Sequence, residues 1–89
     1  MKELLKKYEE LKAAEAAATE AMEASEADPE NEALDEAFDE AYKAEFEKFE
    51  EMEEAIVSFS KGKIDKKTAG LILRKRRSKF EDLIARVAI

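Results

Sequence analysis

The middle of the chain carries its clearest hydrophobic pattern. Large apolar residues recur every third or fourth position, with a mean step of about 3.6 residues, which is the period of an α-helix. They are Leu34, Phe38, Tyr42, Phe46, Phe49, Met52, Ile56 and Phe59. A second, smaller stripe consists of Ala33, Ala37, Ala41 and Ala44. Two apolar stripes need two neighbours, so the pattern predicts a central helix.

Two breaks separate this helix from its neighbours along the chain. At Asp28-Pro29, aspartate is a preferred N-cap and proline is tolerated at the first helical position. Gly62 can adopt the left-handed conformation that closes a helix, and Asp65 can cap the next one. The sequence therefore predicts three helices, at about residues 2–26, 29–60 and 66–88.

The first predicted helix is rich in alanine. Small side chains allow a facing helix with large side chains to approach closely. If the chain folds back near residue 28, Ala18 meets Phe38 and Ala14 meets Tyr42. This match of small and large residues predicts a helical hairpin.

The third predicted helix also carries apolar residues at helical spacing. If the chain folds back again near Gly62, this helix lies antiparallel to the second along most of its length and contacts Phe46 and Phe49. We therefore expect an all-α fold of three long antiparallel helices. A helical hairpin plus the third helix would form a coiled-coil-like bundle, with residues 1–89 in a single domain.

Charge changes the picture, because it is segregated along the chain. The 89 residues carry a net charge of −7. Residues 29–60 hold 12 acidic and 2 basic side chains, a net charge of −10, whereas residues 61–89 hold 10 basic and 3 acidic ones, a net charge of +7. This asymmetry calls for a physical explanation.

Much of the positive charge lies in one basic cluster, Arg74-Lys75-Arg76-Arg77-Ser78-Lys79. We interpret it first as a partner for the acidic second helix within the chain. The expected neighbours are Arg74 with Glu50, Arg77 with Glu47 and Lys79 with Glu45. A protein partner and the phosphates of a nucleic acid are alternatives, although the overall negative charge argues against the second.

Leu71 is unusual because it precedes two further apolar residues, Ile72 and Leu73. Three consecutive helical positions spread over about 200°, which is wider than the face that one neighbour buries. Leu71 is therefore exposed in a monomer or buried in a second contact. A symmetric dimer would supply that contact, and a third helix filling the groove of the hairpin is the alternative. The candidate interaction residues are Leu71, Arg74, Lys75, Arg76, Arg77 and Lys79.

The residue types that most often carry chemistry are missing or isolated. The chain has no Cys and no His, which excludes disulfides, thiolate sites and imidazole bases. Tyr8 and Tyr42 fall on apolar stripes, so we expect both in the core. The acidic residues of the second helix match no metal-binding spacing and are interpreted as a solvated face. We predict no catalytic, cofactor-binding or metal site, and no enzymatic activity.

The remaining expectations concern location and function. No apolar run exceeds three residues, whereas a membrane span needs about 20, and no secretory signal pattern is present. We expect a cytoplasmic protein without membrane contact. The sequence favours a small, acidic, non-catalytic interaction or adaptor protein. We expect it to form a homodimer, and another protein is a candidate partner. A nucleic-acid-associated regulator that uses the basic helix around residues 74–79 is the alternative.

Overall fold

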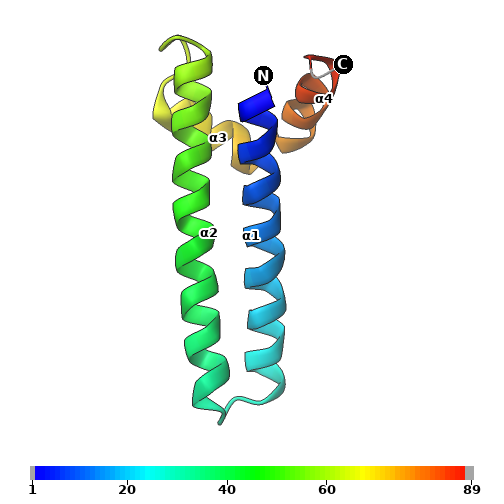
Figure 1. The fold of residues 1–89 in the computed structure, drawn as a ribbon, viewed down its shortest axis with the longest axis vertical. Coiled ribbons are helices and arrows are strands. Elements are labelled where there is room, and N and C mark those ends of the chain that lie inside the picture. Colours follow the sequence, from blue (N-terminus) through cyan, green and yellow to red (C-terminus); the bar gives the residue numbers. More distant parts are fainter. Residues whose placement is uncertain (1, 88–89) are drawn as a thin grey trace.

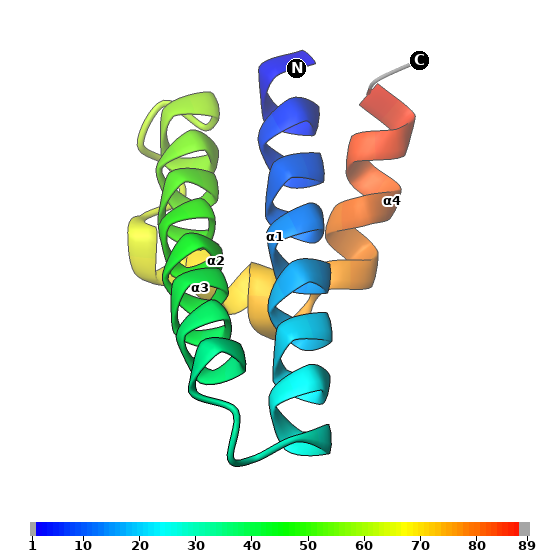
Figure 2. The ribbon, with the colours of Figure 1, turned by 60° about the horizontal axis from the view of Figure 1, so that its bottom comes forward.

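The computed structural model describes residues 2–87, and within them the chain is all-α with no strand. Its helices are α1 (Lys2–Ala27), α2 (Glu32–Phe59), α3 (Lys66–Lys75) and α4 (Arg77–Val87). Helices α1 and α2 form a long antiparallel hairpin, α3 lies across one face of it, and α4 runs beside the N-terminal half of α1 (Figures 1 and 2). The predicted all-α class is confirmed, but four helices are present where three long ones were expected.

The turn between α1 and α2 is longer than the sequence suggested. Asn31, and not Asp28, caps α2, because its side-chain oxygen accepts a hydrogen bond from the backbone N–H of Ala33 at 3.1 Å. Asp28 instead closes a turn, since its carbonyl accepts from the N–H of Asn31 at 3.1 Å. The helix therefore starts at Glu32, three residues after the predicted start at Pro29.

Side-chain contacts across the hairpin set its register. Lys7 pairs with Glu51, and Ser25 donates a hydrogen bond to Asp35. The midpoints of these pairs are residues 29 and 30, so the chain folds back on itself slightly beyond the predicted residue 28. Ala18, in the alanine-rich part of α1, is buried, in keeping with the close approach that small side chains permit.

The connection between α2 and α3 follows the local signals in the sequence. Gly62 has a φ of 82°, and its N–H donates to the carbonyl of Val57 at 3.0 Å, which closes α2 as predicted. Lys61 is also left-handed, with a φ of 56°. Asp65 accepts a hydrogen bond from the N–H of Thr68 at 2.7 Å, so the predicted cap of α3 is confirmed.

A break at Arg76 divides the third predicted helix into α3 and α4. Arg76 leaves the helical region, with φ −128° and ψ 30°, while its N–H still bonds to the carbonyl of Ile72 at 2.9 Å. The chain then turns so that the ring of Phe80 meets Tyr8 of α1 edge-on, with centroids 5.3 Å apart. The prediction of one long helix antiparallel to α2 is therefore wrong, because the apolar face of α4 packs against α1.

The hydrophobic core lies where all four helices meet. Its buried members are Leu4, Tyr8 and Leu11 of α1, Met52 and Ile56 of α2, Ala69 and Leu73 of α3, and Phe80 and Ile84 of α4. Beyond this core, towards the turn at residues 28–31, the hairpin continues without cover from α3 or α4 (Figure 1). Two aromatic residues of α2 in that region are consequently exposed, Tyr42 by 58% and Phe46 by 57%.

Candidate interaction surfaces

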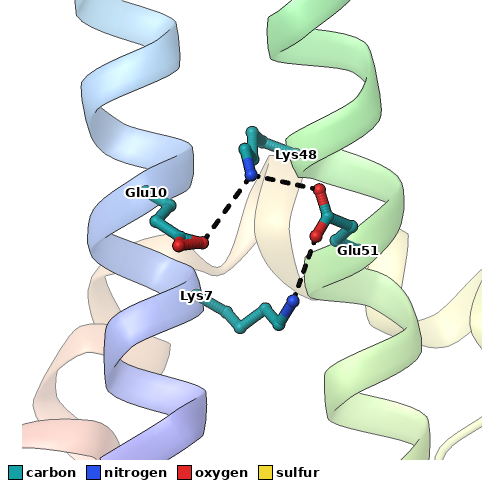
Figure 3. Close-up of polar contacts among 4 residues, drawn as sticks. All are labelled: Lys7, Glu10, Lys48 and Glu51. Carbon is teal, nitrogen blue, oxygen red and sulfur yellow. Dashed lines mark hydrogen bonds and ion pairs between the residues drawn. The ribbon is translucent and has the colours of Figure 1, made fainter.

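A ladder of ion pairs joins α1 to α2 beside the core (Figure 3). Lys7 bonds to Glu51 at 3.0 Å, and Lys48 lies 3.3 Å from Glu51 and 3.8 Å from Glu10. The hydrogen bond from Lys7 lowers the pKa of the Glu51 carboxyl, and the bond to Glu51 raises the pKa of Lys7. These side chains are partly exposed, and exposed pairs stabilise a fold only slightly. The ladder therefore aligns the two helices and is already occupied within the chain.

A second set of polar contacts fastens α4 to α1. The hydroxyl of Tyr8 donates to the carboxylate of Glu81, and Arg77 bonds to Glu15 at 2.6 Å. The Nε of Arg77 also donates to the carbonyl of Leu73 at 3.0 Å. Burial, and then the bond to Glu81, raises the pKa of Tyr8. Tyr8 is a core residue as predicted, whereas the same prediction for Tyr42 is wrong.

The basic cluster is arranged differently from the prediction. Arg77 pairs with Glu15 of α1 and not with Glu47 of α2. The guanidinium of Arg74 lies over the ring of Phe49, 5.1 Å from its centroid, and forms no ion pair with Glu50 among the described residues. The expected pair between Lys79 and Glu45 is likewise missing from the part of the chain described. The break at Arg76 moves the end of the cluster away from α2.

Three basic side chains of the cluster thus face solvent. Lys75, Arg76 and Lys79 are exposed, and none of them forms an ion pair with a carboxylate in residues 3–86. They come from the end of α3, the break and the first turn of α4. This positive charge is available to a partner.

Leu71 faces away from the hairpin. Residues two positions apart in an α-helix point in directions about 200° apart, so Leu71 lies nearly opposite both Ala69 and Leu73. Those two residues are buried against the hairpin, whereas Leu71 is 44% exposed. A single chain therefore leaves much of the Leu71 side chain uncovered.

An open cavity of about 490 Å³ lies where α3 meets the uncovered part of α2. Three aromatic residues of α2 line it, together with residues of α1, α3 and α4. The lining consists of Tyr42, Phe46, Phe49, Glu15, Glu45, Leu73, Arg74 and Arg77. Phe38 extends the aromatic surface towards the turn, with its ring 6.2 Å from that of Tyr42. We call Phe38, Tyr42 and Phe46 the aromatic stripe.

A second hollow of about 310 Å³ lies on the other side of α3. It is almost entirely apolar and is lined by residues of all four helices, including Ile72, Phe59 and Leu83. Phe59 and Leu83 are 53% and 58% exposed, and Arg76 and Lys79 also line it. Sequence reasoning missed both hollows because each depends on the turn of the chain at Arg76.

Comparison with protein families, with curated proteins and with solved structures finds no match to this chain. No helix within residues 2–87 is long and apolar enough to cross a membrane. In the same part of the chain, no three or more Asp or Glu side chains gather in a group that could hold a metal ion.

Proposed function

We propose that this chain is a small, non-catalytic, cytoplasmic interaction protein that binds through exposed apolar side chains and forms a homodimer. One observation carries the proposal: large apolar side chains stay exposed beside the core. They are Tyr42, Phe46, Phe59, Leu71 and Leu83. Isolated exposed apolar residues are ordinary, but Tyr42 and Phe46 line one hollow together and Phe59 and Leu83 line the other. Grouped apolar residues of this kind mark contact sites for other macromolecules.

The shape of the molecule supports this proposal. The chain exposes 6635 Å², whereas a compact monomer of this mass exposes about 5,300 Å². Its radius of gyration is 15.1 Å, against about 12 Å for a compact domain of this length. The excess surface of about 1,300 Å² exceeds the roughly 800 Å² that each partner contributes to a standard interface.

The polar side chains support binding more than catalysis. The hydroxyl of Tyr8, the buried tyrosine, donates a hydrogen bond to Glu81 and has a raised pKa, so it is a poor nucleophile at neutral pH. Ser60 is occupied as well, since its hydroxyl donates to the carbonyl of Val57 and accepts from the N–H of Ile64, both at 3.0 Å. Each of these groups has a structural role.

The exposed charges of Lys75, Arg76 and Lys79 favour a second candidate function, a nucleic-acid-associated regulator. Phosphate contacts of that kind weaken steeply as salt rises, because bound counterions are released. A chain of net charge −7 is a poor overall match for a polyanion. The basic surface is short, so we place this function second.

Three measurements test the proposal together: solution mass, nucleic-acid binding and capture of protein from native lysate. Light scattering across a dilution series should give a dimer mass at high micromolar concentration, and a gel shift with generic DNA and RNA should give no complex at physiological salt. A monomer mass throughout, together with no protein captured from native lysate, would contradict the proposed function. A complex with DNA or RNA tighter than about micromolar, weakened steeply by salt, would favour the second candidate.

A further inference from the structure

We propose that two copies of this chain form an antiparallel dimer in which α3 of each copy packs on the aromatic stripe of the other. This inference rests on the proposed function, since it specifies how the chain self-associates. The occupant of the stripe is thus a second copy of the same chain. Three features of the molecule support this arrangement.

The first feature is the space beside α3. Within its own chain, α3 covers the part of α2 that contains Phe49, Met52 and Ile56. The aromatic stripe comes directly before this part, and the hairpin there has no third layer (Figures 1 and 2). A second α3 placed beside the first would lie on Tyr42 and Phe46, which are the most exposed aromatic residues of the chain.

The second feature is the outer face of α3. Ala69 and Leu73 bury one face of this helix against its own hairpin, and Leu71 points the other way. In the proposed dimer the outer face of α3 contacts the partner hairpin, so Leu71 is covered by the partner's aromatic stripe. The three consecutive apolar positions of α3 then have two neighbours to bury them.

The third feature is complementary charge. Lys75 lies one helical turn after Leu71 and therefore on the same outer face of α3. Asp39 and Glu45 lie three positions before and after Tyr42, next to the stripe. A basic α3 set on this acidic surface is favourable, whereas two stripes facing each other would bring like charges together. The charges thus select α3 as the occupant of the stripe.

A two-fold axis satisfies both contacts at once. If the partner is antiparallel, each α3 lies on the stripe of the other chain, and the contact closes without leaving a surface for further copies. The excess surface of each chain is large enough for an interface of standard size. Closure also predicts a dimer and not a filament.

Disulfide trapping tests the geometry directly, because the natural chain has no Cys. Leu71→Cys mixed with Tyr42→Cys should give a mixed disulfide under mild oxidation as the main crosslinked product. Lys6→Cys is the matched control, since Lys6 is exposed and lies nearly opposite the core residues Leu4 and Tyr8 on α1. Mixed with Leu71→Cys, it should give no such product.

A charge exchange tests the same contact in the reduced protein. Lys75→Glu and Asp39→Lys should each weaken the dimer about tenfold or more, since like charges then face each other. The double variant restores opposite charges at both symmetric contacts and should regain most of the affinity. Circular dichroism of each variant at low concentration checks that the helices are retained.

The outcomes separate this arrangement from self-association itself. A dimer mass with no disulfide between the Leu71→Cys and Tyr42→Cys variants, or with no rescue in the double charge variant, would contradict the arrangement and leave the interaction function standing. A monomer mass at every concentration would overturn the dimer, and capture of another protein by that monomer would show that the interaction function survives without it.

Discussion

At the scale of single residues, Tyr8 shows how burial and a hydrogen bond act together. The residue is 4% exposed and its ring contacts Phe80, while its hydroxyl reaches the carboxylate of Glu81 at the surface. This residue therefore links the core to the polar contacts that fasten α4 to α1. Tyr42, the other tyrosine, is exposed and serves as a natural control.

Tyr8→Phe should lower the free energy of unfolding by about 1 kcal/mol at neutral pH, the usual net value of a hydrogen bond. The raised pKa of Tyr8 also predicts an effect of pH. A group whose pKa is raised on folding stabilises the fold fully below its unfolded pKa, about 10 for tyrosine. That contribution is lost as the pH rises through the folded pKa.

Urea unfolding at neutral and alkaline pH measures both effects. The natural chain and Tyr42→Phe should lose more stability on going to alkaline pH than Tyr8→Phe does. Equal losses in all three proteins would show that the ionisation of Tyr8 is not coupled to folding.

At the scale of elements, caps and breaks decide where each helix begins. Asp65 begins α3 by accepting the N–H of Thr68, and hydrogen bonds from the side chain and backbone of Thr68 lower the pKa of Asp65. A group whose pKa is lowered on folding stabilises the fold above its unfolded pKa, about 4 for aspartate. The contribution of this cap should disappear as the pH falls through the folded pKa.

Asp65→Ala should therefore lower the melting temperature at neutral pH, and its effect should become smaller as the pH falls below the unfolded pKa of about 4 and through the lowered folded pKa of Asp65. Asp65→Asn is the matched variant, because asparagine caps a helix about as well as aspartate without a charge. Thermal unfolding followed by circular dichroism measures the melting temperatures of the natural chain and the two variants. A destabilisation by Asp65→Ala that is independent of pH would contradict this reasoning.

Gly70 lies inside α3 and is buried. A Cβ at this position would come within 2.5 Å of a carboxylate oxygen of Glu53, but that atom ends a flexible side chain and can move away. Glycine in a helix interior costs up to about 1 kcal/mol relative to alanine. Gly70→Ala should thus raise the free energy of unfolding by about 0.5–1 kcal/mol. Chemical denaturation measures this change in the free energy of unfolding. A clear loss of stability would mean that the Glu53 side chain cannot move.

At the scale of the whole molecule, stability should vary along the hairpin. All four helices meet around Met52 and Ile56, whereas the part of α2 near the turn at residues 28–31 lies beside α1 without cover from α3 or α4 (Figure 1). Local opening is easiest where few apolar contacts are buried. Amide hydrogens of α2 should therefore exchange faster near Tyr42 than near Met52.

Hydrogen exchange at low and high micromolar concentration extends this prediction to the dimer. Protection near Tyr42 should rise with concentration as a second copy covers the stripe, and protection near Met52 should change little. Tyr42→Ser, at an exposed site, should remove the dependence on concentration while keeping the helices folded. Uniform protection along α2 at low concentration would contradict the proposed difference within the hairpin.

The sequence by itself determined that the chain is all-α, and it determined most of the ends of α1 and α2 and the start of α3. The spacing of apolar residues predicts α2. Gly62 ends α2 and Asp65 begins α3, each through contacts with residues a few positions away. These features are local, so the tertiary fold was not needed to infer them. At the first turn two capping residues competed, and Asn31 prevailed over Asp28.

Only the tertiary structure decided where the last quarter of the chain packs. The residues from Lys66 to Val87 read as one helix because no Pro or Gly marks Arg76 as a break. The break is favourable because the turned chain buries Phe80 and Ile84 with Leu4 and Tyr8 of α1. Contacts between residues so far apart leave no periodic signal in the sequence. The exposed stripe on α2 is a consequence of that turn.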